Sequence, residues 1–174
     1  MRLLDDTILV FTADHGEAFL EHRFFLHNEV YKQLLHVPLI IRLPASCNGR
    51  TIKTPVGLED ITPTILSLVD IDIPKIVTGE RLPMTSTVNR PRRQFYGYYQ
   101  FGSEEFLDEF SLLEGDWKLV YQKYPNGKWQ TELYNIAEDP EEQNPITTQT
   151  ERQTTLHKDL LKWMNSQPSI GSNK

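Results

Sequence analysis

The chain of 174 residues is 39% hydrophobic and 24% charged, a balance that excludes disordered and fibrous proteins and suits one domain or a domain and a half. Its formal net charge of −6, with no basic stripe, argues against nucleic acid as a partner. No apolar run approaches the ~20 residues that a membrane span requires, and the single cysteine, Cys47, excludes an internal disulfide.

A strand is predicted over residues 7–12, because residues 8–11 form an unbroken apolar run that is too short for a typical helix. Such a run is typical of a strand that is buried on both faces inside a parallel sheet. The polar residues Asp14 and His15 follow it directly. Open α/β sheets bind ligands beyond the carboxyl ends of their strands, so we expect a functional site here. Carboxylate oxygen and imidazole nitrogen both bind divalent cations, which makes this pair candidate metal ligands; an ordinary hydrogen-bonded turn is the alternative.

A polar and aromatic loop follows, and it contains Glu17, His22 and His27. A protonated imidazole can stabilise developing negative charge or deliver a proton, so His27 is a candidate catalytic residue. The alternative for His27 is a histidine that caps a helix or lies in a core. Glu17 and His22 are candidates for a supporting role around the site. A short helical segment is predicted over residues 29–35 and a second strand around residues 37–41.

The next elements are a loop and a helix. Residues 43–50 are predicted to form a surface loop with a turn at Asn48-Gly49. A helix is predicted to start at Thr62-Pro63, a capping residue followed by the proline that is typical of the first helical position, and to end near Asp70. Residues 71–84 contain two prolines and a glycine, which favours an extended crossover.

A basic cluster separates the two halves of the chain. Its members, Arg90, Arg92 and Arg93, are interpreted as a solvated linker face, with a clamp that faces the substrate as the alternative. The aromatic run at residues 95–99 is interpreted as core and cross-strand packing, with a platform for stacking carbohydrate as the alternative.

The second half is predicted to form a small antiparallel sheet. Short runs rich in β-forming residues cover residues 111–114, 117–124 and 128–134, and Asn126-Gly127 is a strong hairpin signal between the last two.

A helix is predicted over residues 151–165 from the spacing of Leu156, Leu160, Leu161 and Met164. We therefore divide the chain into an α/β core at residues 1–90, a small sheet with a terminal helix at residues 91–165, and a frayed tail at residues 166–174.

Taken together and in this order, the motifs resemble the C-terminal half of the sulfatase catalytic domain, in the alkaline phosphatase superfamily. The first match is Asp-His-Gly-Glu at residues 14–17, followed by His27, Tyr31 and Val-Pro-Leu-Ile-Ile at residues 37–41. The second match is Asp-Ile-Thr-Pro-Thr-Ile-Leu at residues 60–66. The last matches are Gly-Asp-Trp-Lys-Leu-Val at residues 115–120, Glu-Leu-Tyr-Asn-Ile at residues 132–136 and Asp-Pro with Glu142 and Asn144 at residues 139–144.

The resemblance implies an α/β fold: the C-terminal part of a sulfatase-type α/β sandwich, with a small antiparallel β-sheet subdomain and a C-terminal helix. It implies that Asp14 and His15 bind a divalent metal cation. Calcium is the cation expected from the family, with Mn²⁺ or Zn²⁺ as alternatives because the nitrogen of His15 suits them better. It also implies that His27 stands where the family has Lys or His, reaching the sulfate oxygens or the leaving group.

The resemblance further implies parts that are not found in these 174 residues. Sulfatases use a Cys/Ser-x-Pro-x-Arg motif, whose first residue is oxidised to a formylglycine nucleophile, and two further acidic metal ligands. In the family both lie N-terminal to the region that matches here. We therefore expect the C-terminal part of a metal-dependent sulfuric ester hydrolase that is inactive alone.

Two partners are expected under this hypothesis. One is a sulfate-ester small molecule or a sulfated carbohydrate, and the other is the missing N-terminal half that would carry the nucleophile. Two alternatives stay open: a phosphodiesterase or phosphonate hydrolase of the same superfamily, and a non-catalytic remnant domain.

Overall fold

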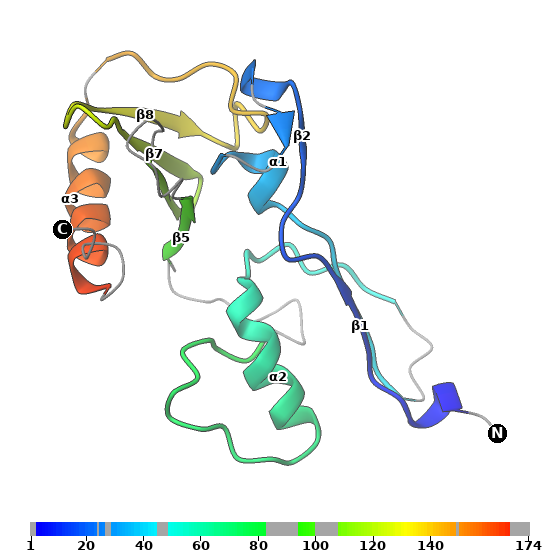
Figure 1. The fold of residues 1–174 in the computed structure, drawn as a ribbon. Helices are drawn as coiled ribbons and strands as arrows, with labels where there is room; N and C mark the ends of the chain where they lie inside the picture. Colours follow the sequence, from blue (N-terminus) through cyan, green and yellow to red (C-terminus); the bar gives the residue numbers. More distant parts are fainter. Residues whose placement is uncertain are drawn as a thin grey trace. The chain divides into compact units, whose positions relative to one another are not determined.

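The computed structural model describes residues 3–23, 25–26, 29–44, 49–82, 94–99, 108–148 and 150–167 (Figure 1). Contacts divide the chain into two compact units: Met1–Asp14 with Pro38–Pro91, and His15–Val37 with Arg92–Lys174. The segment His15–Val37 thus groups with the second half of the chain. The predicted domain boundaries at residues 90 and 165 stay predictions. Among the described residues, no helix has the length and apolar character needed to cross a membrane.

The first unit contains a two-stranded antiparallel sheet. Strand β1 (Leu9–Thr12) pairs with β4 (Leu39–Arg42), so that Val10 lies opposite Ile41, and the 3-10 helix η1 (Leu3–Asp6) precedes β1. The prediction of a strand buried inside a parallel sheet is wrong in this structure. β1 and β4 run in opposite directions, and no third strand joins them among the described residues. Three of their apolar side chains, Leu9, Phe11 and Ile40, are exposed to solvent.

The helix of the first unit begins earlier than the predicted Thr62-Pro63 start. Helix α2 covers Ile61–Leu68 and follows the 3-10 helix η3 (Leu58–Asp60). The carboxylate of Asp60 is fully buried and accepts hydrogen bonds from the backbone N–H groups of Gly57 (3.1 Å) and Glu80 (2.8 Å). Asp60 thereby ties the helix start to the extended crossover, whose described residues form neither helix nor strand, as predicted. The proline stays within the first turn, where its missing N–H is tolerated.

The second unit contains the predicted antiparallel sheet, which is confirmed. Its strands lie in the order β5 (Gln94–Tyr99), β6 (Asp108–Glu114), β7 (Trp117–Lys123) and β8 (Trp129–Asn135). The hairpin between β7 and β8 is also confirmed: Gly127 has φ of +79° and the Tyr124 N–H donates to the Lys128 carbonyl at 2.8 Å. Glycine suits this turn because residues with a Cβ rarely adopt positive φ.

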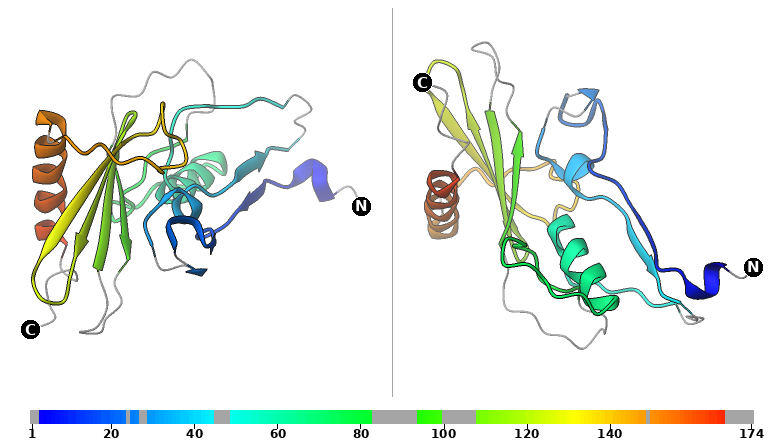
Figure 2. Two further views of the ribbon diagram at one scale, coloured as in Figure 1. Left: turned by 90° about the horizontal axis from the view of Figure 1, so that it is seen from above. Right: turned by 60° about the horizontal axis from the view of Figure 1, so that its bottom comes forward.

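One face of this sheet is covered by the terminal helix α3 (Glu151–Ser166), and the views from different directions agree on this (Figures 1 and 2). The helix begins where Thr150 accepts a hydrogen bond from the Gln153 N–H at 3.0 Å. The core between helix and sheet contains Phe110, Tyr121 and five fully buried leucines. The leucines are Leu112, Leu119, Leu133, Leu156 and Leu160.

The other face of the sheet is covered by the segment that contains α1 (Lys32–Leu35), which is shorter than the predicted helical segment. Because side chains alternate along a strand, Leu119 faces α3 while its neighbour Val120 packs with Val30 and Tyr31. The short strands β2 (Ala18–Phe19) and β3 (Phe25–Leu26) form a hairpin ahead of α1, with the 3-10 turn η2 (Glu21–Arg23) between them.

Candidate functional site

The predicted metal pair lies immediately after β1. The side chains of Asp14 and His15 are both exposed to solvent. The Nδ1 atom of His15 lies 2.8 Å from the carbonyl oxygen of Gly16. In the tautomer with the proton on Nδ1, the ring donates to this carbonyl. Donor type and exposure therefore fit a divalent cation.

The structure places no complete metal centre around this pair. Among the residues that are described, no three His, Cys, Asp or Glu side chains gather in a way that could hold a metal ion. Calcium takes six to eight oxygen ligands and zinc takes four ligands. Asp14 and His15 together supply two donor groups, so they stay predicted members of a larger ligand shell.

Several predicted residues lie outside the described part of the chain. They include the candidate catalytic residue His27, the predicted turn at Asn48 and the basic cluster at Arg90, Arg92 and Arg93. The backbone resumes at Glu29, two residues after His27, so the support of the residues that follow can be examined.

Three glutamates of the second unit hold the segment that follows His27. Glu109 accepts a hydrogen bond from the backbone N–H of Val30 at 3.2 Å. Glu132 accepts from the Tyr31 hydroxyl at 2.6 Å, and Glu142 accepts from the N–H of Lys32 at 3.1 Å. Sequence analysis missed this function of the glutamates, because nothing in their local sequence indicates a partner about 80–110 residues away.

A buried ion pair lies beneath this segment. The Lys118 ammonium contacts the Glu142 carboxylate at 2.8 Å, and both side chains are about 5% exposed or less. Burial lowers the pKa of Lys118, and the Glu142 carboxylate opposes that shift. Since Glu142 also accepts from the backbone of Lys32, one carboxylate joins strand β7 to the start of α1.

Glu29 is the most unusual ionisable residue of the segment. It is 2% exposed, and neither carboxylate oxygen has a hydrogen-bond partner among the described residues. Burial, followed by the charge of nearby Glu109, raises the pKa of Glu29 to about 7. Burial also raises the pKa of Glu109, whose carboxylate accepts from the Gln122 side chain at 2.7 Å. A carboxyl group without partners is most stable there in its neutral form.

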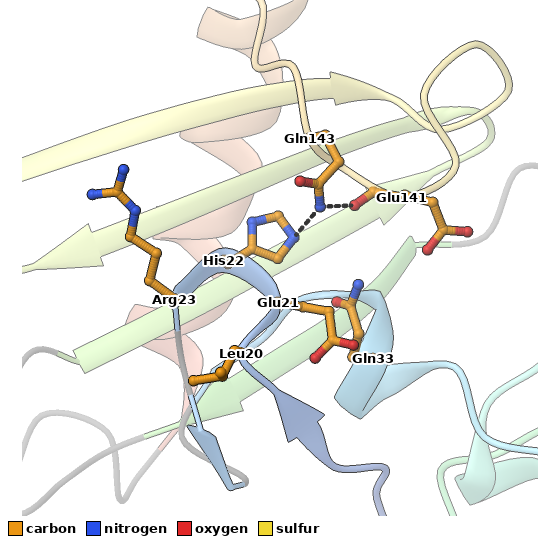
Figure 3. A pocket seen from close by; sticks show the side chains of 7 residues that line it. All are labelled: Leu20, Glu21, His22, Arg23, Gln33, Glu141 and Gln143. Atoms are coloured by element: carbon orange, nitrogen blue, oxygen red, sulfur yellow. Dashed lines mark hydrogen bonds between the residues drawn. The ribbon is translucent and has the colours of Figure 1, made fainter.

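His22, a predicted supporting residue, lies at a hollow in the surface of the second unit. Its ring stacks on Tyr31, with centroids 3.9 Å apart and planes inclined by 7°. The hollow has a volume of about 730 Å³ and is lined by the turn Leu20–Arg23, by Gln33 of α1, and by Glu141 and Gln143 after β8 (Figure 3). Apart from His22, sequence analysis did not identify these residues, because the turn and the segment after β8 meet only in the folded chain.

Comparison with known proteins identifies relatives of this chain. The family model described as "N-sulphoglucosamine sulphohydrolase, C-terminal" matches residues 20–168. Arylsulfatase K of Xenopus laevis is 31% identical over 84% of this chain and 29% of the relative. An N-acetylglucosamine-6-O-sulfatase of Bacteroides thetaiotaomicron is 27% identical over 82% of this chain and 27% of the relative.

Solved structures are similar to this chain as well. The structure of BT4656 in complex with its substrate, D-glucosamine-2-N,6-O-disulfate, gives a TM-score of 0.71 and 26% identity, covering 93% of this chain and 35% of that one. The putative sulfatase yidJ from Bacteroides fragilis gives a TM-score of 0.74 at 24% identity, over 92% of this chain and 36% of that one, which supports the fold alone. The chain spans about a third or less of the length of these relatives.

Proposed function

The chain belongs to the family of the N-sulphoglucosamine sulphohydrolase C-terminal region, within the sulfatases, and on that premise we propose that it is the C-terminal part of a metal-dependent sulfuric ester hydrolase. The sulfatase resemblance and the sulfatase-type α/β fold predicted from the sequence are confirmed by these matches. The observation that carries the proposal is the family match over residues 20–168, which begins five residues after His15.

The proposed substrate is a sulfated carbohydrate, and within that class a sulfated amino sugar. BT4656 is bound to a sulfated glucosamine, and the similar Bacteroides thetaiotaomicron enzyme is named for an N-acetylglucosamine sulfate ester. Both proteins are 26–27% identical to this chain. A sulfate-ester small molecule of another kind is the broader form of the same proposal.

Asp14 and His15 are proposed to hold a divalent cation: Ca²⁺ by family, or Mn²⁺ or Zn²⁺ because of the imidazole. When bound, such a cation neutralises charge on the sulfate oxygens. His27 is proposed to bind those oxygens or to protonate the leaving group, as an imidazolium can do both. Glu109, Glu132 and Glu142 do not touch the substrate in this proposal; they would hold the backbone that follows His27.

A formylglycine nucleophile is proposed to lie in an N-terminal part, since Cys/Ser-x-Pro-x-Arg is not found in this sequence. Loss of a covalent nucleophile removes the reaction pathway rather than slowing it. The chain of 174 residues alone is therefore proposed to lack turnover of aryl sulfates.

A metal titration of this chain tests the proposal directly. Calorimetric titration with Ca²⁺, Mn²⁺ and Zn²⁺ should give binding that Asp14→Ala weakens by about tenfold or more, as expected for loss of a charged ligand. The matched control is Asp72→Ala, which removes another exposed carboxylate from the first unit. Equal affinities in the parent chain and Asp14→Ala would refute the assignment of the metal ligand.

An activity test separates the sulfatase proposal from its alternatives. The chain joined to a sulfatase N-terminal part should hydrolyse an aryl sulfate, whereas Asp14→Asn in the same protein should not. If an aryl phosphate or phosphonate ester is hydrolysed faster than the aryl sulfate, the result would favour the alternative of a phosphodiesterase or phosphonate hydrolase. No hydrolysis of any of these esters would favour a non-catalytic domain.

A further inference from the structure

The hollow beside η2 is built entirely within the second unit, so its walls are placed relative to one another. Its volume of about 730 Å³ lies within the range of small-molecule sites in proteins. Figure 3 shows the walls: the turn with Glu21 and His22, Gln33 beside it, and Gln143 opposite. Most of these side chains end in hydrogen-bonding groups, which suits a polar ligand with several hydroxyls.

The floor of the hollow is held in place by packing. His22 stacks on Tyr31, which is 3% exposed and donates its hydroxyl hydrogen to Glu132. On the opposite wall, the backbone N–H of Gln143 donates to Asp139 at 3.1 Å. The Gln143 side chain donates to the Glu141 carbonyl at 3.0 Å and lies 3.5 Å from His22 Nε2 (Figure 3). A ligand would therefore meet His22 and Gln143 already held in place, which lowers the entropy cost of binding.

The backbone around the hollow is strained. Leu20, His22 and Arg23 have φ of 84°, 49° and 65°, and Glu142, between two lining residues, has φ of 56°. Side chains other than glycine rarely adopt these angles. Such conformations persist where the surrounding structure enforces them, and they gather at binding sites.

Among the described charged side chains around the hollow, Arg23 is a cation that can pair with a ligand. The carboxylate of Glu141 is paired with the ammonium of Lys32. Glu21 accepts a hydrogen bond from the N–H of Phe19, and backbone hydrogen bonds lower its pKa, so it is an ionised acceptor. Arg23 has no ion-pair partner among the described residues, and its guanidinium is a fork of donors that matches a sulfate or a carboxylate.

Gln33 supplies a hydrogen-bonding group that the fold itself does not use. Its Oε1 atom is buried and has no hydrogen-bond partner within the described part of the chain. Buried polar atoms are nearly always paired, so an orphan acceptor at the wall of a polar hollow indicates a missing donor. A ligand hydroxyl is a donor of the required kind, and it would reach this covered atom once the Gln33 side chain rotates toward the hollow.

We infer that this hollow binds an anionic sugar residue, whose sulfate or carboxylate pairs with Arg23 and whose hydroxyls bond to Gln33, Gln143 and Glu21. The inference rests on the proposed function, because it takes a sulfated carbohydrate as the substrate. It adds a place for a charged sugar at the turn between His15 and His27. Neutral sugars would lack the partner for Arg23 and would bind less tightly.

Titrations of the whole 174-residue chain by heteronuclear NMR test this inference. The probes are N-acetylglucosamine 6-sulfate, glucuronate, glucose and inorganic sulfate. Both anionic sugars should bind about tenfold more tightly than glucose or free sulfate, as expected when a charge-assisted hydrogen bond adds to hydroxyl contacts. Binding of free sulfate as tight as that of the anionic sugars would reduce the hollow to an anion site and overturn the inference. Equal binding of glucose, or no binding of any probe, would overturn it too.

Two variants distinguish ligand contact from structural support. Arg23→Gln should raise the Kd of the anionic sugars about tenfold and leave that of glucose unchanged. Gln33→Leu should weaken all three sugars while keeping or raising the melting temperature, because it removes no intramolecular hydrogen bond of the described residues. Lys158→Gln, which removes an exposed charge from α3, is the matched control and should change nothing. A lower melting temperature with unchanged affinity in Gln33→Leu would assign Gln33 to the fold instead.

The failure of this inference can be told from the failure of the proposed function. Asp14→Ala should leave the sugar titration unchanged, because Asp14 does not line the hollow. Metal binding without sugar binding would remove only the inference. If the parent chain binds the sugars but none of the three cations, that result would count against the proposed function alone.

Discussion

The carboxylate of Glu142 lies 2.8 Å from the ammonium of Lys118, with both side chains almost completely buried. The same carboxylate accepts a hydrogen bond from the Lys32 N–H at 3.1 Å. A charge from β7 is thus neutralised by a residue that also fixes the first residue of α1. The ion pair links the C-terminal sheet to the segment that follows His27.

Lys118→Met should destabilise the second unit by about 3–5 kcal/mol, because it leaves the Glu142 carboxylate buried without its counter-charge. Urea unfolding followed by tryptophan fluorescence measures this unit, since all three tryptophans lie in it. Lys158→Met on the exposed face of α3 is the control and should stay within about 0.5 kcal/mol of the parent. A similar small effect in Lys118→Met would show that the ion pair does not hold the unit together.

Glu29 should make the stability of the second unit depend on pH. Its pKa is raised from 4.5 to about 7 in the folded chain, so the folded state favours the neutral carboxyl. The stabilisation is fully present below pH 4.5 and is lost as the pH rises through about 7. The difference corresponds to about 3 kcal/mol at most. The charged groups around Glu29 are Glu109, Glu21, Lys118 and Glu142.

Glu29→Gln should remove this contribution while keeping the size of the side chain. Unfolding of parent and variant measured from pH 4.5 to pH 8 should show the parent losing stability relative to the variant as the pH rises. Parallel pH profiles would mean that Glu29 titrates normally.

Gly16→Ala should destabilise the contact between the loop after His15 and α1. A Cβ at residue 16 would stand 1.8 Å from the backbone oxygen of Gln33, far below any real contact. The Gly16 N–H donates to the Leu34 carbonyl at 2.8 Å, so relieving the clash would also break this hydrogen bond. The expected loss is about 3 kcal/mol or more in the same unfolding experiment.

Gly127→Ala provides the contrast, since it tests a glycine needed for its backbone angle rather than for space. Residue 127 has φ of +79° with nothing near its Cβ position, so the loss should be about 1 kcal/mol. Equal losses at both positions would contradict the close approach of Gly16 to α1.

Thr150→Ala should cost about 1 kcal/mol, because the hydroxyl caps α3 by accepting from the Gln153 N–H at 3.0 Å. Thr155→Ala is the matched control, since its exposed hydroxyl donates only to the Glu151 carbonyl within the helix. It should be neutral or slightly stabilising. A helix cap that contributes nothing would give the two variants equal stability.

Local patterns in the sequence were sufficient for the elements that depend on neighbouring residues. The apolar spacing of α3 and the Asn126-Gly127 turn predict a helix and a hairpin that the structure confirms. These signals are reliable because helix periodicity and turn angles are decided within a few residues along the chain. The order of the motifs also sufficed for the sulfatase resemblance, which the family match over residues 20–168 confirms.

Only the tertiary structure decided which elements meet. The apolar run of β1 predicts a buried parallel strand. In the structure β1 pairs antiparallel with β4, and Phe11 is 55% exposed. Helix α2 begins at Ile61, next to buried Asp60, whose carboxylate accepts from the backbone N–H of Glu80, a contact that only the fold creates. Burial and pairing depend on what packs against a segment, and residue pattern alone does not contain that.

The candidate site shows the same difference between what local sequence indicates and what only the fold brings together. Asp14 and His15 stand out in the sequence because their chemistry and their place after a strand are local facts. Glu132 and Glu142 belong to motifs of the resemblance, but neither they nor Glu109 show in the sequence that the fold brings them to the backbone N–H groups and hydroxyl of residues 30–32. Their roles come from desolvation and hydrogen bonding across about 80–110 residues of chain, which are properties of the folded state.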